Sequence, residues 1–261
     1  MFQSFAARYG PWAIVAGASE GLGAAFAEQL AARGVNLLLL ARRVELLAEV
    51  KQRLSADTSV EIRTEACDLA RHDLAEVIEG LTRDLEIGLA VYNAAYSPIG
   101  AALDRPLAEL LRVVDVNVRG PLVLARTLAP AMVSRGRGGI VLMSSMAGFQ
   151  GAPRIATYAA SKAFNIVLGE GLWSELAPHG VDVVVSCAGA VRTPGYQRTS
   201  KRDAPGTLDA NVVAQQTLDA LGRGALIVPG ATNQLARFML GHLLPRRAAI
   251  SIMASSTKDL T

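Results

Sequence analysis

Two residues with acid–base chemistry, Tyr158 and Lys162, lie four positions apart in the chain. In an α-helix of about 3.6 residues per turn, positions i and i+4 share a face, so the ammonium can stand beside the phenolic oxygen. A tyrosine ordinarily titrates near pH ~10, and a positive charge ~4 Å away stabilises the phenolate by about 4 kcal/mol at an effective dielectric of about 20. The spacing predicts that Lys162 lowers the pKa of Tyr158 and makes the phenol an acid/base; the alternative is an ordinary pair on a helix surface.

A glycine cluster near the start of the chain predicts a phosphate site. The apolar run Trp12–Ala16 reads as a strand, Gly17, Gly21 and Gly23 follow it, and an amphipathic pattern covers Ala24–Arg33. Glycines permit a tight turn and the close approach of backbone to a pyrophosphate, whose charge meets the free amides of the helix start. Strand, glycine turn and helix together indicate a dinucleotide-binding turn, although glycine also marks turns that bind nothing.

These two motifs resemble those of the short-chain dehydrogenase/reductase family, and the resemblance covers almost the whole chain. Ser145 stands thirteen residues before Tyr158, the separation usual in that family. The opening Tyr9–Trp12 and the segment 34–54 resemble the branch of 17β-hydroxysteroid dehydrogenases and long-chain 3-ketoacyl reductases. The remaining matching motifs, in chain order, are Asn93-Ala94-Ala95, Asn117, Ser144-Ser145 and Gly189-x-Val191-x-Thr193.

The resemblance implies a catalytic set of Asn117, Ser145, Tyr158 and Lys162. In this set Ser145 donates a hydrogen bond to the charge that develops on a carbonyl oxygen, and Tyr158 delivers the proton. Lys162 lowers the phenol pKa and holds the nicotinamide ribose, while Asn117 positions a water that returns the proton. The cofactor-binding residues that we expect are Gly17, Ser19, Glu20, Gly21, Leu22, Gly23, Arg42, Asp68, Leu69, Asn93, Ala94, Ala95, Tyr158, Lys162, Val191 and Thr193.

Three alanines depart from the family pattern. Ala16 stands where threonine is usual, Ala95 where glycine is usual and Ala188 where proline is usual. Because alanine is small, we expect the fold to tolerate all three. Ala16 cannot supply a hydroxyl to hold the Asn93 turn, and Ala95 puts a methyl group beside the nicotinamide.

The order of strand-like and helix-like patterns predicts the fold class. Strands and helices alternate, which indicates right-handed βαβ units and a parallel sheet. We expect one α/β domain over residues 1–261: a doubly wound Rossmann sheet of about seven strands with helices on both faces. A lid is expected around residues 193–210, where Thr193–Leu208 looks irregular, and a C-terminal helical segment over 232–254. The expected strands are Trp12–Ala16, Asn36–Ala41, Val60–Ala66, Leu89–Asn93, Ile140–Met143, Val181–Cys187 and Leu226–Val228. The expected helices include Val44–Leu54, Leu107–Val118, Leu122–Val133, Thr157–Leu176 and Asn211–Leu221.

The end of the second strand favours NADP(H), with NAD(H) as a possibility. An acid there suits the ribose 2′-hydroxyl of NAD, whereas a base suits the 2′-phosphate of NADP, and this strand runs into Arg42 and Arg43. Glu20 opposes this assignment, because it stands where some NADP enzymes carry a base. The alternative for the two arginines is a solvated helix start. Asp68 resembles the residue that binds adenine in the family; its alternative is a helix N-cap.

The segments near Tyr158 predict a hydrophobic ketone, or the matching secondary alcohol, as substrate. Ile99, Met146 and Phe149 offer apolar walls, and Arg154 is the one candidate cation for a carboxylate. The resembling branch points toward steroid or ketoacyl substrates. The alternative function is a non-catalytic regulator that senses NADP on the same fold.

Composition limits the other partners. The 26 basic and 23 acidic residues give a net charge of only +3 without a basic run, which argues against nucleic acid. The three histidines are isolated, so we expect no metal site. The chain shows no secretory leader or long apolar run, and Cys67 and Cys187 lie in apolar strands, which favours a soluble cytoplasmic protein with reduced thiols. Leu235–Leu244, followed by two arginines, is expected to be a pocket lid or a subunit contact; the alternative is an interfacial membrane helix.

Surplus apolar residues on two helices predict a homodimer, or a tetramer of such dimers. The helices Leu122–Val133 and Thr157–Leu176 carry more apolar side chains than one buried face needs. The resemblance implies that these helices form a two-fold interface. The alternative is that the surplus packs beneath the C-terminal segment. The residues in question are Val123, Leu124, Leu128, Phe164, Val167, Leu168, Leu172 and Trp173.

Overall fold

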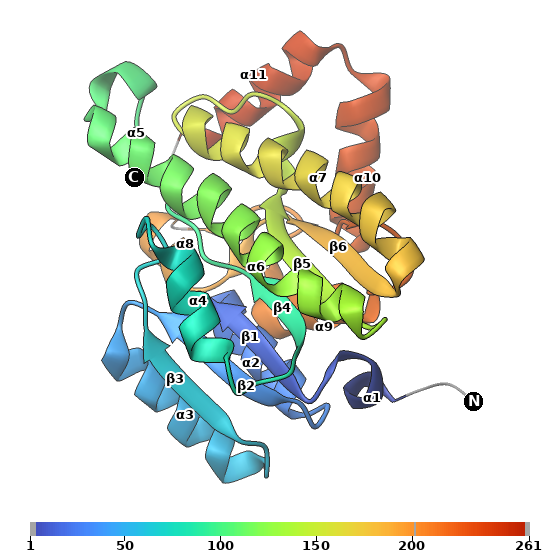
Figure 1. Cartoon of the computed structure of the whole chain (residues 1–261). Helices are drawn as coiled ribbons and strands as arrows, with labels where there is room; N and C mark the ends of the chain where they lie inside the picture. Colours follow the sequence, from blue (N-terminus) through green and yellow to red (C-terminus); the bar gives the residue numbers. More distant parts are fainter. Residues whose placement is uncertain (1–3, 201, 259–261) are drawn as a thin grey trace.

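A parallel seven-stranded sheet forms the centre of the molecule (Figure 1). The computed structural model describes residues 4–200 and 202–258. The strand order is β3-β2-β1-β4-β5-β6-β9, so the chain leaves β1 in one direction, returns, and continues in the other. This order confirms the predicted doubly wound α/β fold. The strands are β1 (Trp12–Ala16), β2 (Asn36–Ala41), β3 (Ile62–Ala66), β4 (Ile87–Tyr92), β5 (Gly138–Ser145), β6 (Val181–Ala188) and β9 (Leu226–Ile227).

Helices cover both faces of the sheet. One group, α2, α3 and α9, packs on one face, and α4, α6 and α7 pack on the other (Figure 1). Burial on two sides explains why β1 is apolar throughout instead of alternating with polar residues. Their bounds are α2 (Gly21–Ala31), α3 (Val44–Asp57), α4 (Leu74–Thr82), α6 (Gly120–Ser134), α7 (Ala156–Leu176) and α9 (Ala210–Asp219).

The core therefore lies in two layers. Successive residues of a strand point to opposite faces, so Val15 joins the cluster under α2 and α3, whereas Ile14 joins the cluster under α4, α6 and α7. Both side chains are fully buried. Cys67 and Cys187 are buried free thiols, as predicted, and burial raises the pKa of Cys187 to about 12.

The predicted bounds differ from the structure mainly in short elements. The helix expected from Ala24 begins at Gly21, because the glycine turn is itself the first helical turn. The stretch Thr193–Leu208 is not irregular throughout: it contains a short helix and the start of a strand that pairs with Val191–Arg192. The shorter elements are α1 (Phe5–Tyr9), η1 (Ala102–Asp104), α5 (Leu107–Val114), the π-helical η2 (Asp115–Arg119), η3 (Met146–Phe149), η4 (Ala177–His179), β7 (Val191–Arg192), α8 (Pro194–Thr199), β8 (Leu208–Asp209), α10 (Ala231–Phe238), the π-helical η5 (Met239–Leu243) and α11 (Arg246–Thr257).

Candidate active site

A cavity of about 720 Å³ opens along the carboxyl ends of the strands. In a doubly wound sheet this edge is hollow where the strand order reverses, here between β1 and β4. Segments far apart in the chain meet there because every strand of the sheet ends at the same edge. Of the predicted site residues, those that line the cavity are Gly17, Ser19, Glu20, Gly21, Leu22, Arg42, Asp68, Leu69, Asn93, Ala94, Ala95, Ser145, Tyr158 and Thr193.

The glycine turn is shaped by close backbone contacts. Gly17 has φ +88°, a left-handed conformation that favours glycine. A Cβ at Gly23 would lie 1.9 Å from the Gly17 carbonyl oxygen, so that position admits no side chain. The Asn93 side-chain amide donates to the same carbonyl at 2.9 Å, and the Ala16 carbonyl accepts from the backbone amides of Asn93 and Ala94. Backbone and amide contacts thus hold the turn that Ala16 cannot hold with a hydroxyl.

Tyr158 and Ser145 face the cavity together. Ser145 ends β5 and caps the following turn, where its Oγ accepts from the Ala147 amide at 3.2 Å. Burial raises the pKa of the Tyr158 phenol, and a hydrogen bond with Ser145 opposes part of that rise. A raised pKa keeps the phenol protonated at neutral pH, which suits a proton donor.

Lys162 does not act on Tyr158 as the spacing predicts. Its Nζ donates to the Met143 carbonyl at 2.9 Å and lies 5.5 Å from the centroid of the Tyr158 ring. The ammonium is therefore placed over the Tyr158 ring and makes no hydrogen bond to the phenolic oxygen. Burial raises the pKa of Tyr158, so the expectation of a lowered pKa is wrong. Burial lowers the pKa of Lys162 itself to about 8.

Asn117 is fully buried in the π-helical turn η2. Its Oδ1 accepts from the Tyr96 amide at 2.8 Å, and its Nδ2 donates to the Tyr96 carbonyl at 2.9 Å and to Ser161 Oγ at 3.0 Å. Ser161 Oγ in turn donates to the Tyr158 carbonyl at 2.7 Å. The side chain thus links the loop after β4 to α7. Because its polar atoms already make these hydrogen bonds, a water positioned here would need another polar group of the turn as its partner.

Arg43, which the sequence does not assign to the cofactor, contacts the glycine turn directly. Its Nη2 lies 2.9 Å from Glu20 Oε1 and 3.0 Å from Ser19 Oγ. The hydrogen bond from Arg43 is the main cause that lowers the pKa of Glu20, against partial burial, with a smaller contribution from Arg198. Arg42 is exposed and lines the cavity just before α3 begins. Glu20 is therefore surrounded by positively charged side chains.

Asp68 lines the cavity beyond β3 and is not a helix N-cap, because α4 begins six residues later, at Leu74, and its N-cap is Asp73. Partial burial acts to raise the pKa of Asp68, but the Ala70 amide and the Arg112 guanidinium outweigh it and leave the pKa below its usual range. Arg112 Nη2 lies 2.9 Å from Asp68 Oδ2. This cationic neighbour comes from α5 and was not predicted.

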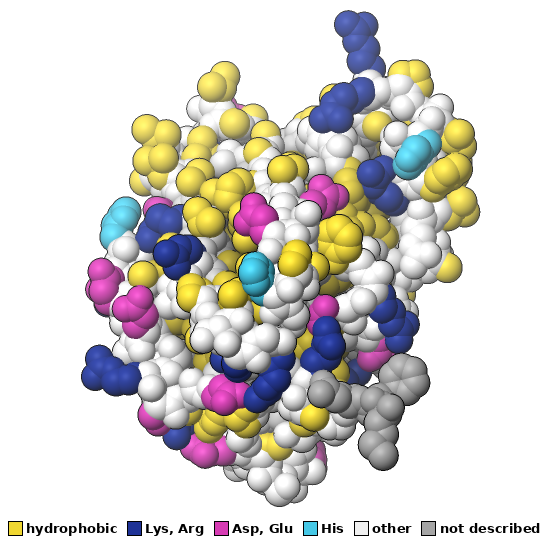
Figure 2. Space-filling model, turned by 45° about the vertical axis from the view of Figure 1, so that its right-hand side comes forward, with side chains coloured by type: hydrophobic (Ala, Val, Ile, Leu, Met, Phe, Trp, Pro, Cys, Tyr) yellow, Lys and Arg dark blue, Asp and Glu magenta, His cyan; other side chains and the backbone are white. Residues whose placement is uncertain are grey.

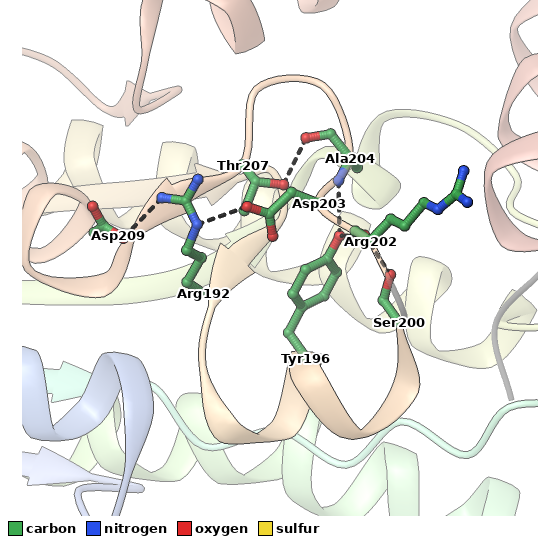
Figure 3. A network of polar contacts seen from close by, with 8 residues as sticks. All are labelled: Arg192, Tyr196, Ser200, Arg202, Asp203, Ala204, Thr207 and Asp209. Atoms are coloured by element: carbon green, nitrogen blue, oxygen red, sulfur yellow. Dashed lines mark hydrogen bonds and ion pairs between the residues drawn. The ribbon is translucent and has the colours of Figure 1, made fainter.

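The segment after β6 contributes residues to the cavity lining. It is held by a polar network (Figure 3). Arg192 pairs with Asp203 at 2.7 Å and with Asp209 at 2.9 Å. Tyr196, which lines the cavity, accepts from the Ala204 amide at 3.0 Å and donates to the Arg202 carbonyl at 3.2 Å. Burial would raise the pKa of Tyr196, but hydrogen bonds with Ser200, Ala204 and Thr207 outweigh it.

Thr193 connects this segment to the glycine turn. Its Oγ1 caps α8 by accepting from the Tyr196 amide at 3.1 Å, and its methyl group would touch a Cβ placed on Gly21. Four predicted site residues do not line the cavity: Gly23 lies under the turn, Asn117 is buried in η2, Lys162 is buried behind Tyr158, and Val191 is in β7.

The wall around Tyr158 is apolar, with one correction to the predicted set. Ile99 and Met146 line the cavity, and Ile155, Tyr158 and Met253 pack in one cluster. Phe149 points away instead, because η3 turns its ring under the Arg237 guanidinium at 3.9 Å.

Arg154 and Ala188, which the sequence singled out, lie outside the cavity lining. Arg154 donates to the Lys258 carbonyl at 2.7 Å and is not among the cavity-lining residues that the structure describes. Ala188 is buried at the end of β6. The C-terminal helix α11 supplies cavity-lining residues that lie partly beyond the predicted segment 232–254, namely Met253, Ser256 and Thr257.

The sequence profile of the family described as short chain dehydrogenase matches residues 11–204. The chain belongs to this family. As a short-chain dehydrogenase/reductase it is an oxidoreductase that acts on hydroxyl and carbonyl groups, and its family uses NAD(P). Members of the family are typically oligomeric.

The chain resembles hydroxysteroid dehydrogenases and ketoacyl reductases, as the sequence predicted. It is 32% identical over 234 residues to a 7beta-hydroxysteroid dehydrogenase of Clostridium sardiniense, which covers 88% of this chain and 90% of that protein. It is 37% identical over 203 residues to the very-long-chain 3-oxoacyl-CoA reductase of Podospora anserina, covering 73% of this chain and 58% of the reductase. The chain thus spans a little over half the length of that reductase.

Solved structures of other dehydrogenases share this fold. One, from a study of 7beta-hydroxysteroid dehydrogenase stereoselectivity, has a TM-score of 0.90 at 26% identity and covers 96% of this chain and 99% of its own. Another is a short-chain dehydrogenase from Sphingobium yanoikuyae in complex with NADPH, with a TM-score of 0.80 at 28% identity, covering 92% and 95%.

Within residues 4–200 and 202–258, no cluster of three or more histidine, cysteine or acidic side chains could hold a metal ion. In the same part of the chain, no helix has both the length and the apolar character to cross a membrane.

Proposed function

We propose that this short-chain dehydrogenase is an NADP(H)-dependent enzyme that reduces hydrophobic ketones or oxidises the matching secondary alcohols. Tyr158 is the proton donor. The observation that carries this proposal is that Tyr158 and Ser145 face the same cavity as the glycine turn and Arg42. A carbonyl group and a dinucleotide can therefore meet at one place.

The glycine turn, the start of α2 and the arginines after β2 fit such a cofactor. Gly17 and Gly23 let the backbone of the turn pack closely on itself and on Ala94, and the amides at the start of α2 attract phosphate charge. Arg42 would contact a 2′-phosphate, as its exposure and cavity position allow. When bound, the reduced nicotinamide supplies a hydride to the carbonyl carbon.

Residues of the protein then stabilise and protonate the carbonyl oxygen of the substrate. Ser145 donates a hydrogen bond to the charge that develops on the carbonyl oxygen, and Tyr158 delivers its phenolic proton to the same oxygen. The raised pKa of Tyr158 favours the protonated form that this step needs. With a pKa of about 8, Lys162 remains largely protonated at neutral pH and places a positive charge beneath the ring as the phenolate forms.

The apolar wall supports a hydrophobic substrate. Ile99, Met146, Ile155 and Met253 line the cavity, and Ile155 and Met253 pack against the same small alanine cluster as Tyr158. The charged lining residues come from the glycine turn, from the ends of β2 and β3 and from α5; they are Glu20, Arg42, Arg43, Asp68 and Arg112. The names of the relatives point to steroid or acyl-chain ketones, and we propose a substrate of that class. Residues 193–210 act as the lid over it.

A scan of NADPH oxidation against steroid, 3-ketoacyl and bulky aryl ketones tests this function, with NADH in parallel. We expect turnover of at least one class with NADPH preferred. The absence of turnover across the panel, together with tight NADPH binding, would favour the alternative function, a non-catalytic sensor of NADP.

A further inference from the structure

Helix α10 and the π-helical turn η5, near the C-terminus, expose the apolar face that a helix ordinarily buries. Leu235, Phe238, Met239 and Leu243 follow one another at positions i, i+3, i+4 and i+8, the spacing of a single apolar stripe. Their exposed fractions are 61%, 52%, 46% and 62%. The stripe of α10 and η5 therefore faces solvent and not the core.

The opposite face of the same helix is polar and is tied to the protein. Asn233 is 5% exposed, and its Nδ2 donates to the carbonyls of Gly206 and Pro229 at 3.0 and 2.9 Å. Gln234 donates to the Val228 carbonyl at 3.0 Å. Arg237 covers the Phe149 ring at 3.9 Å. Specific polar contacts thus hold the helix in the orientation that turns its apolar stripe outward.

The charge of this region has one sign. Between Asp219 and Asp259 the chain carries five lysines and arginines and no acidic residue. Arg246 and Arg247 are both exposed, at the start of α11, directly after the stripe. In Figure 2 the upper right of the molecule, where Figure 1 has the C-terminal helices, carries hydrophobic side chains on its outer edge with lysine or arginine side chains above them.

We propose that this C-terminal surface, made of Leu235, Phe238, Met239, Leu243, Arg246 and Arg247, docks on an anionic lipid bilayer. An apolar stripe beside arginines suits the boundary between acyl chains and headgroups, with the guanidinium groups on the lipid phosphates. A second copy of the chain is a poorer occupant. A two-fold contact of this surface with itself would bring the same arginines together with no acidic residue of the segment between them.

The position of the surface gives it a role at the cavity. The helix that begins with Arg246 and Arg247 continues to Met253, Ser256 and Thr257, which line the cavity. Its intervening residue Ile252 is 43% exposed. A ketone dissolved in the bilayer would therefore reach the cavity along α11 without crossing water, a consequence that rests on the proposed function.

Vesicle flotation tests the docking surface with the full chain. Vesicles of phosphatidylcholine are compared with vesicles of phosphatidylcholine and phosphatidylglycerol, at low and high salt. We expect binding to the anionic vesicles that weakens in salt. The double variants Phe238→Ser/Met239→Ser and Arg246→Glu/Arg247→Glu should each lower this binding by about tenfold or more, since each arginine near such a surface contributes about fivefold.

Two matched controls separate the surface from general effects. Leu103→Ser removes another exposed apolar side chain, and Arg83→Glu reverses another exposed charge; both should bind as the wild type does. Absence of binding to anionic vesicles, or equal binding by all variants, would overturn the proposal. So would a fall in oligomer mass in the Phe238→Ser/Met239→Ser variant, since that result assigns the surface to a subunit contact. Flotation needs no turnover, so its failure is distinct from failure of the ketone assay.

Discussion

Arg198 of α8 lies 2.9 Å from Glu20 of the glycine turn, although 178 residues separate them in the chain. The same oxygen, Glu20 Oε1, also pairs with Arg43 at 2.9 Å. One carboxylate therefore links the cofactor turn, the end of β2 and the segment that we propose as a lid. An anion that binds Arg43 in place of Glu20 would weaken this link.

Replacement of Glu20 by glutamine should strengthen NADPH binding. The substitution removes a negative charge beside the place proposed for the 2′-phosphate and releases Arg43 from its ion pair. Because Glu20 and Arg43 are partly exposed, we expect a modest gain, roughly three- to tenfold in affinity, with a smaller change for NADH. Titration by fluorescence measures both constants. Glu45→Gln, in the exposed first turn of α3, is the control, and a weaker NADPH complex in Glu20→Gln would contradict the arrangement.

Arg42→Ala tests the reading of the 2′-phosphate directly. We expect NADPH affinity to fall by about 1 to 3 kcal/mol, the scale of a lost charge-assisted contact, while NADH affinity changes little. Arg83→Ala, an exposed arginine at the end of α4, should leave both unchanged. Equal losses for the two cofactors would show that Arg42 does not distinguish them.

Tyr158→Phe should abolish ketone reduction and preserve NADPH binding, because it removes one proton donor and almost no volume. We expect a loss of at least about a hundredfold in kcat, the scale of general acid catalysis. Steady-state kinetics with a ketone that the wild type reduces, together with NADPH titration, separates the two effects. Activity within tenfold of the wild type would remove Tyr158 from the proposed role.

Much of the fold and of the candidate site could be predicted because the signals are local. The buried runs of β1 and β2 have the bounds expected from their apolar residues, since a strand covered on both faces must be apolar throughout. Likewise, the Tyr158–Lys162 spacing and the glycine turn are visible within a few residues. Parallel strands then carry these local motifs to one edge of the sheet.

The missing parts depend on contacts between distant segments. Nothing near Glu20 in the sequence points to Arg198, and the orientation of Lys162 toward Met143 follows from how α7 packs on β5. The pKa of Tyr158 was mispredicted for the same reason: helical spacing gives the face of a side chain but not the burial of its end. The paired strands β7 and β8 are two residues each, too short to show a pattern.

The pKa of Lys162 predicts a pH-dependent stability. Its folded value of about 8 lies below the ordinary 10.5, so between these values the unfolded chain holds a proton that the folded protein releases. The unfolded state binds more protons, and the contribution of Lys162 to the free energy of unfolding therefore rises with pH, by up to about 1.4 kcal/mol per unit. Denaturant unfolding at several pH values between 8 and 10 measures it.

Comparison with Lys162→Met isolates this contribution, because the buried cysteines and tyrosines titrate in both proteins. The difference in unfolding free energy, wild type minus variant, should increase across the window. For Lys51→Met, which replaces an exposed lysine of α3, the difference in unfolding free energy from the wild type should stay constant with pH. A constant difference for Lys162→Met would show that Lys162 keeps an ordinary pKa in the folded protein.

The apolar residues named on the two helices expected at a subunit interface are not all exposed in the structure. Leu124 and Leu128 belong to the core, so part of the predicted surplus is ordinary packing, whereas Val167 and Trp173 remain 69% and 41% exposed on α7. We propose that this exposed face is covered in a homodimer or in a tetramer of such dimers. Val167→Glu would then bury two uncompensated charges at the contact and should shift the mass measured by light scattering to the 27.4 kDa monomer. Val44→Glu, at another exposed valine on α3, should keep the wild-type mass. A wild-type protein that is monomeric at micromolar concentration would refute the interface.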